Sequence, residues 1–139
     1  HDCVVGDKVI IANCGTLAGH VVIHDHAVIG GLTAIHQFVR IGRLSITGGC
    51  SKVVQDVPPF MMADGNPLAV QSINIVGLKR AGFSEELQSA VKRAFKVISR
   101  ENLNTSQAVK RLEEEFPEMN EVSQALCEFL KSTERGITR

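Results

Sequence analysis

A six-residue repeat runs without an insertion through residues 5–58. An aliphatic residue occupies every sixth position in eight of nine cases: Val5, Ile11, Leu17, Ile23, Ile29, Ile35, Ile41, Thr47 and Val53. The position four residues later is always small or β-branched: Val9, Gly15, Val21, Ala27, Thr33, Val39, Ser45, Ser51 and Val57. An α-helix cannot keep a period of six on one face, because it has 3.6 residues per turn. We therefore predict a β-solenoid of short strands, with the aliphatic side chain pointing inward and the small residue at the tight corner.

Three faces of six residues make a triangular coil of 18 residues, so residues 5–58 make three coils. Residues 18 positions apart then lie above one another, at the spacing of about 4.8 Å between paired strands. This register predicts that His1 and Asp2 lie beside Gly19 and His20, one coil away. The chain begins inside the pattern, and we expect further coils before it.

The repeat stops at Gln55-Asp56-Val57-Pro58-Pro59, because two prolines cannot extend a paired strand. We interpret residues 60–67 as a linker or a final irregular coil. The sequence then becomes helical in character. We expect a short helix over 72–80, a helix N-capped by Ser84 with two acidic residues in its first turn, and further helices over about 106–116 and 120–133. The predicted domains are a β-solenoid over 1–68 and a small helical bundle over 69–139.

The composition excludes several classes of protein. Lys+Arg and Asp+Glu both number 15, so the formal net charge is zero and gives no reason to expect binding to nucleic acid or to a membrane surface. No apolar run reaches the ~20 residues of a membrane helix. The four cysteines show neither a CxxC pair nor metal spacing, which indicates reduced thiols in a cytoplasmic protein.

The cluster of His1, Asp2 and Gly19 combines residue types that can form a catalytic site. A histidine can act as a general base near neutral pH, and a neighbouring carboxylate can fix its tautomer. A glycine one coil away can present a bare backbone N–H to a developing oxyanion. The alternative is a surface histidine at a solenoid corner, and spacing alone leaves both open.

Gly31 and Gly49 form another column, together with Asn13. They relieve crowding at a corner, or they form a groove floor along which an extended ligand lies. The histidines also raise a zinc hypothesis, since some hexapeptide solenoids are zinc carbonic anhydrases. His24 and His26 fall in columns different from that of His20, so three converging ligands are not expected and we predict no metal site.

A basic cluster in the helical region is either a solvated face or a docking surface for an acidic carrier protein or phosphates. Its members are Lys79, Arg80, Lys92, Arg93, Lys96 and Arg100.

Several longer stretches together resemble the acyl-ACP:UDP-N-acetylglucosamine O-acyltransferases of lipid A synthesis, over essentially the whole chain. They are HDC at 1–3, LAGHV at 17–21, IGGLTAIHQF at 29–38, GGCS at 48–51, QDVPPF at 55–60, GN at 65–66, NIVGLKRAGF at 74–83 and TERGITR at 133–139. The repeat alone would indicate only an acyltransferase-like solenoid. One local departure is Ala81, where many members have a second arginine.

The resemblance implies a homotrimer of left-handed parallel β-helices with active sites in the clefts between subunits. The implied reaction transfers a 3-hydroxyacyl chain from acyl carrier protein to the glucosamine 3-hydroxyl of UDP-N-acetylglucosamine, without a cofactor, a metal or a covalent enzyme intermediate. By resemblance, His1 is the general base, Asp2 orients it, and the Gly19 N–H stabilises the oxyanion.

The resemblance also implies the residues that bind substrate. His20, His36 and Gln37 would position the sugar nucleotide, and Asn74 and Arg80 would hold its nucleotide end. The acyl chain would lie beside Gly31, Ile46 and Gly49, and the glycine at 49 implies a long donor of about C14 or more. The alternatives are a sister N-acyltransferase of the same pathway and an inactive trimeric scaffold.

Overall fold

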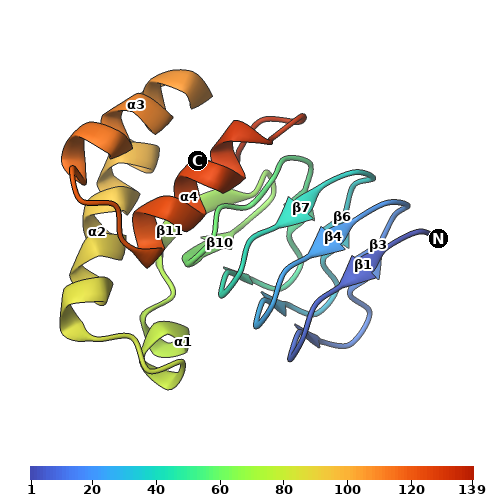
Figure 1. The fold of residues 1–139 in the computed structure, drawn as a ribbon. Coiled ribbons are helices and arrows are strands. Elements are labelled where there is room, and N and C mark those ends of the chain that lie inside the picture. Colours follow the sequence, from blue (N-terminus) through green and yellow to red (C-terminus); the bar gives the residue numbers. More distant parts are fainter.

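A triangular stack of short strands leads into a layer of helices (Figure 1). The computed structural model describes the backbone of residues 1–139 and every side chain except that of Arg100. Nine two-residue strands form the stack: β1 (Val4–Val5), β2 (Ile10–Ile11), β3 (Thr16–Leu17), β4 (Val22–Ile23), β5 (Val28–Ile29), β6 (Ala34–Ile35), β7 (Arg40–Ile41), β8 (Ile46–Thr47) and β9 (Lys52–Val53). The predicted β-solenoid followed by helices is confirmed.

The strands pair in parallel with a register of 18 residues. Val4 pairs with Val22, and Val22 pairs with Arg40. Three sheets result, in the orders β1-β4-β7, β3-β6-β9 and β2-β5-β8 with two further strands beyond β8. The 18-residue coil with three faces is therefore confirmed.

The corners are built differently from the expectation. The small residues are not at the corners: Val21, Ala27 and Val39 are fully buried and share the core with the aliphatic position. From Cys3 to Ser51, a two-residue turn precedes each residue at this inward position, and the second turn residue has a positive φ. These residues are Asp2, Lys8, Cys14, His20, His26, Leu32, Phe38, Leu44 and Cys50. Side chains seldom adopt this left-handed conformation, which sequence spacing alone did not reveal.

The turns define three edges of the prism, and these names are used below. Edge 1 comprises residues 1–2, 19–20 and 37–38. Edge 2 comprises residues 7–8, 25–26 and 43–44. Edge 3 comprises residues 13–14, 31–32 and 49–50.

The segment after the prolines is more regular than expected. Residues 60–67 are not a linker, since β10 (Met61–Asp64) pairs in parallel with β8 and extends the stack. β11 (Ala69–Ile73) then pairs antiparallel with β10. The helix expected from 72 begins only at Ile75, because strand pairing holds the residues up to Ile73 extended.

Four helices follow: α1 (Ile75–Arg80), α2 (Glu85–Arg100), α3 (Thr105–Glu115) and α4 (Glu121–Lys131). Ser84 caps α2 as predicted, accepting a hydrogen bond from the Leu87 N–H. Their buried faces form one core with Phe60 and Met61, while the solenoid has its own core. The β10–β11 hairpin spans the predicted boundary at residue 68, and the division into two domains stays a prediction. No helix among the described residues is long and apolar enough to cross a membrane.

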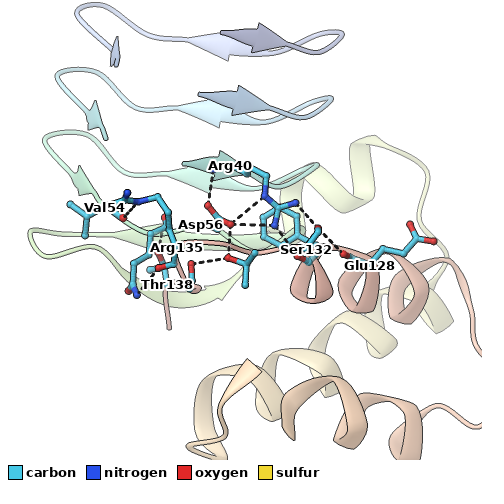
Figure 2. A network of polar contacts seen from close by, with 11 residues as sticks. Arg40, Val54, Asp56, Glu128, Ser132, Arg135 and Thr138 are labelled. Atoms are coloured by element: carbon cyan, nitrogen blue, oxygen red, sulfur yellow. Dashed lines mark hydrogen bonds and ion pairs between the residues drawn. The ribbon is translucent and has the colours of Figure 1, made fainter. Parts of the chain in front are cut away.

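Asp56 joins the last coil to α4 (Figure 2). Its side chain is 1% exposed. It accepts hydrogen bonds from the Arg40 backbone N–H at 2.8 Å and from the Arg40 guanidinium at 3.2 Å, and from the Thr133 hydroxyl at 2.6 Å. The same guanidinium donates to the Phe129 carbonyl and to Ser132, and lies 4.2 Å from the centre of the Phe129 ring.

The C-terminal tail adds a further rung to the stack. The Asp56 N–H donates to the Gly136 carbonyl, and the Thr138 N–H donates to the Asp56 carbonyl at 2.7 Å. Ile137 is buried by this pairing. Arg135 also donates to the Val54 carbonyl at 3.1 Å. The end of the solenoid is therefore covered by the tail of the same chain.

We predict that Asp56→Asn lowers the free energy of unfolding by about 3 kcal/mol, because it leaves the Arg40 guanidinium partly buried without its counter-charge. Denaturant unfolding measures the change. The control is Glu113→Gln, which removes an exposed ion pair with Lys131 and should change stability by less than about 0.5 kcal/mol. Equal stabilities for Asp56→Asn and the unaltered protein would contradict this interpretation.

Candidate active site

Edge 1 brings His1, Asp2, Gly19 and His20 together, as the register predicted. The His20 N–H donates to the His1 carbonyl at 3.1 Å, which fixes the two coils against each other. Asp2 and His20 both have a positive φ near 60°, so their side chains leave neighbouring coils in the same direction. The predicted column is confirmed in its geometry, while the roles of its residues stay predictions.

His1 and Asp2 form a close pair. His1 Nδ1 lies 2.7 Å from Asp2 Oδ2. A carboxylate only accepts, so the neutral imidazole donates through Nδ1 and leaves a lone pair on Nε2. The His1 side chain is 77% exposed, which makes Nε2 accessible to a ligand. The pair can therefore take a proton from a hydroxyl placed beside Nε2.

Gly19 lies directly against the His1 ring. A Cβ built on Gly19 would be 2.8 Å from His1 Cε1 and 2.8 Å from Nε2, closer than such atoms approach. Glycine at 19 thus allows the imidazole to occupy its place. The Gly19 N–H donates no hydrogen bond among the described residues, so it is available to an oxyanion near Nε2.

His20 shares the same carboxylate, since its Nε2 lies 3.8 Å from Asp2 Oδ2. His1, Asp2 and His20 are the one group of described histidines, cysteines and carboxylates whose ligand atoms, all within 4.8 Å, could hold a metal ion. The distance between His1 and Asp2 is that of a hydrogen bond, and the expectation of no metal stays a prediction.

Gln37 lies on the same edge, in the coil that follows Gly19 and His20, and His36 directly precedes it. Both are exposed, and His36 Nδ1 lies 3.1 Å from the Gln37 carbonyl. Edge 1 therefore collects five of the predicted residues, with His36 directly beside it, and their polar groups face solvent together.

Asn74, Arg80 and Ile46 line a groove elsewhere, on the face of β2, β5 and β8 beside edge 2. The groove has a volume of about 270 Å³. Both ends of the Asn74 side chain are already engaged: Oδ1 accepts from the Gly77 N–H at 3.1 Å, and Nδ2 donates to the Leu44 carbonyl at 2.8 Å. Asn74 therefore caps α1 and fixes it to the solenoid, a role that the sequence reading missed although Asn before a short helix is a cap signal.

Gly31 and Gly49 lie on edge 3. A Cβ on either would meet only backbone oxygen at 3.2 Å as its nearest neighbour, whereas a Cβ on Gly30 would be 2.5 Å from the Gly49 nitrogen. Internal packing therefore requires glycine at 30 far more strictly than at 31 or 49. This difference favours the groove interpretation of Gly31 and Gly49 over relief of crowding.

The predicted residues thus fall on three separate parts of one prism. The cluster of His1, Asp2 and Gly19 is on edge 1, the Arg80 groove is beside edge 2, and the bare backbone is on edge 3. A whole face of the coil separates edge 1 from edge 2 and from edge 3, so one chain does not bring the edge 1 cluster together with the other two groups.

His24 does not join His20. His24 lies at the far side of β4, in a pocket of about 290 Å³ that Arg40, Arg43 and Phe129 also line. Burial lowers the pKa of His24, and the positive charge of Arg40 lowers it further, against the opposing effect of Asp25 and Asp56. His24 therefore tends to be neutral beside the Arg40–Asp56 pair.

The basic cluster is not one surface. Arg93 turns toward α3, where it contacts Glu115 at 3.7 Å and lies over the Phe116 ring. Lys79 and Lys92 line a hollow of about 350 Å³ between α1 and α2. The side chain of Arg100 lies outside the described residues.

Comparison with known proteins gives consistent matches. Residues 56–138 match the family described as UDP N-acetylglucosamine O-acyltransferase, domain 2. The acyl-[acyl-carrier-protein]–UDP-N-acetylglucosamine O-acyltransferase of Thiobacillus denitrificans is 48% identical over 139 residues, which cover 100% of this chain and 54% of that protein. The chain thus spans about half the length of such relatives.

Solved structures agree with this match. The LpxA structure from Acinetobacter baumannii has a TM-score of 0.94 and 42% identity, and that from Bacteroides fragilis has a TM-score of 0.95 and 35% identity. Each covers 100% of this chain, and this chain covers 54% of each. The fold is the left-handed parallel β-helix of these proteins, followed by helices. The sequence match over the last coil and the helices, together with the matching fold over the whole chain, shows that the chain belongs to the UDP-N-acetylglucosamine O-acyltransferase family.

Proposed function

We propose that this protein transfers a 3-hydroxyacyl chain from acyl carrier protein to the glucosamine 3-hydroxyl of UDP-N-acetylglucosamine, the first step of lipid A synthesis. The observation that supports it is the His1–Asp2 pair with the Gly19 backbone against its free nitrogen. The relatives are named acyl-[acyl-carrier-protein]–UDP-N-acetylglucosamine O-acyltransferases. We also propose that the protein is cytoplasmic, because its cysteines are free thiols, as is usual in a reducing compartment.

The chemistry requires one proton transfer in each direction. His1 Nε2 takes the proton of the sugar 3-hydroxyl as its oxygen attacks the thioester carbonyl carbon. The Gly19 N–H stabilises the resulting oxyanion. As the C–S bond breaks, the thiolate of the carrier protein leaves and takes up the proton from the His1 imidazolium. Asp2 stabilises that imidazolium through its bond to Nδ1. No metal or cofactor has a part in these steps.

Substrate binding extends over the other predicted residues. His20, His36 and Gln37 face the site on edge 1 and would contact the sugar nucleotide. Arg80 would pair with the phosphates of the sugar nucleotide. Asn74 uses both ends of its side chain to cap α1 and attach it to the solenoid, so it would position α1 as well as contact the nucleotide. Lys79, Lys92 and Lys96 offer positive charge to an acidic carrier protein.

We predict that His1→Ala lowers kcat of the complete gene product by about 10²–10⁴, the usual contribution of a general base. Asp2→Asn should lower kcat less, because Nε2 remains but its orientation is weakened. Steady-state transfer to UDP-N-acetylglucosamine is the measurement. The control is His24→Gln, because His24 lies at the far end of β4 from edge 1. Undiminished activity of His1→Ala would refute the mechanism. Preference for an acceptor with a 3-amino group would favour the N-acylating alternative.

We propose that the complete site forms between copies of the chain in a homotrimer. The three groups of predicted residues lie on different edges of one prism, so they can meet only if edge 1 of one copy faces the Arg80 groove of the next. A closed ring of three copies satisfies this with one repeated contact, since each copy offers both surfaces.

This arrangement predicts complementation between two inactive variants. His1→Ala and Arg80→Ala copies, mixed by co-expression or refolding, should recover activity, because some clefts receive an intact His1 from one copy and an intact Arg80 from its neighbour. Each variant assembled alone is the control. If mixed assemblies form and stay as inactive as the separate variants, the site lies within one chain.

The bare backbone at edge 3 predicts donor length. Gly49→Met should shift the preference from about C14 or longer toward shorter donors by filling the groove. It should cost less stability than a side chain at Gly30, because an added Cβ at 49 lies 3.2 Å from a backbone oxygen, whereas one at 30 lies 2.5 Å from a backbone nitrogen. Gly30→Ala is the contrast, and should destabilise the fold. Transfer from a C10 to C16 series measures the effect, and a C10 preference of the unaltered protein would contradict it.

A further inference from the structure

Phe38 is an exposed aromatic residue on edge 1 to which the proposed chemistry gives no role. Its ring stacks on the imidazole of His20, with centroids 4.8 Å apart and the planes within 8° of parallel. Half of its surface, 49%, remains open to solvent. Single exposed apolar side chains are common on protein surfaces, so the stack on His20, and not the exposure of Phe38, is the informative observation.

The stack follows from the backbone. Asp2, His20 and Phe38 are 18 residues apart and have φ values of 58°, 60° and 64°. The Phe38 N–H donates to the Gly19 carbonyl at 3.1 Å, as the His20 N–H does to His1. Three side chains in the same rare conformation therefore leave three coils in one direction. Each can contact the next, and the ring of Phe38 covers the face of His20.

His20 is held on two sides. Phe38 covers one face of its imidazole, and the His1 ring meets it edge-on, at 5.3 Å and 88°. Stacking leaves the nitrogens at the ring edge free, and Nε2 faces Asp2 Oδ2 at 3.8 Å. Asp2 Oδ2 is also the atom that binds His1 Nδ1. The position of the His20 ring therefore affects the carboxylate that orients the proposed base.

We propose that Phe38 is a positioning residue for the transfer reaction, acting through His20. Its ring keeps the His20 imidazole edge toward Asp2, and this keeps the Asp2–His1 pair aligned with the acceptor hydroxyl. Phe38 itself does not reach the reacting atoms. The inference rests on the proposed function for its effect on rate, but not for its effect on the histidine rings.

A double-mutant cycle tests the coupling. Phe38→Leu, which keeps apolar bulk and removes the ring face, should lower kcat about tenfold and change KM for the sugar nucleotide less than threefold. In the His20→Ala background the same change should alter kcat less than about twofold, because the residue through which it acts is absent. Phe38→Tyr, which keeps the ring face, should restore kcat. Losses that multiply, or a Tyr variant as slow as the Leu variant, would overturn the proposal.

A spectroscopic measurement separates this inference from the function. The Phe38 ring should shift the imidazole C–H proton signals of His20 upfield, and Phe38→Leu should remove that shift and move the ¹⁵N signals of His1. Leu32→Ala is the matched control, since Leu32 is exposed with a φ of 58° at the same turn position on edge 3. It should leave both sets of signals in place.

The outcomes are distinguishable. If Phe38→Leu leaves the signals of His20 and His1 unchanged, the proposal is overturned whatever the activity. If the signals move as expected but the unaltered protein does not acylate UDP-N-acetylglucosamine, the proposed function fails and the control of the two histidines by Phe38 stands. Should Phe38→Leu unfold, Phe38→Tyr and Phe38→Met provide the same comparison with a ring and without one.

Discussion

The parallel hydrogen bonds between coils are the constraint on which the rest of this structure depends. They fix residues 18 positions apart over each other, as Val4 lies over Val22 and Val22 over Arg40. Side chains at the turns must then leave the prism in vertical columns. The His1–Asp2 pair contacts Gly19 and His20 for this reason alone, and the closeness of the Gly19 backbone to the His1 ring would be lost with a slip of one residue.

A stack of parallel strands has an end that must be covered, because its last backbone groups are otherwise unpaired. In this chain the β10–β11 hairpin continues one sheet, and residues 136–138 pair with the segment around Asp56. The buried Arg40–Asp56 pair and Thr133 fix α4 to that end (Figure 2). The hairpin in turn places α1 beside the solenoid, so the groove that Arg80 lines is a consequence of how the stack ends.

Each of the three edges has a different part in the proposed reaction. Edge 1 has the groups proposed to transfer a proton, with Phe38 and Asp2 on either side of His20. The groove beside edge 2 has positive charge, and edge 3 has backbone without side chains over Gly31 and Gly49. A triangular prism cannot fold its own edges together, and for that reason the geometry of a single chain favours an assembly in which edges of different copies meet.

The sequence by itself determined the solenoid, its 18-residue coil, the column of His1, Asp2, Gly19 and His20, and the Ser84 cap. These follow from periodicity and local capping, which act over one or two coils or one helical turn. It did not reveal that the corner residues have positive φ, that residues 61–64 form a strand, or that Asn74 caps α1. The Asn74 cap is local and its signal was overlooked, whereas the attachment of Asn74 to Leu44, the pairing of residues 61–64 and the burial of Asp56 against Arg40 and Thr133 were decided only by the tertiary structure, because they depend on contacts between segments up to 77 residues apart that leave no period in the sequence.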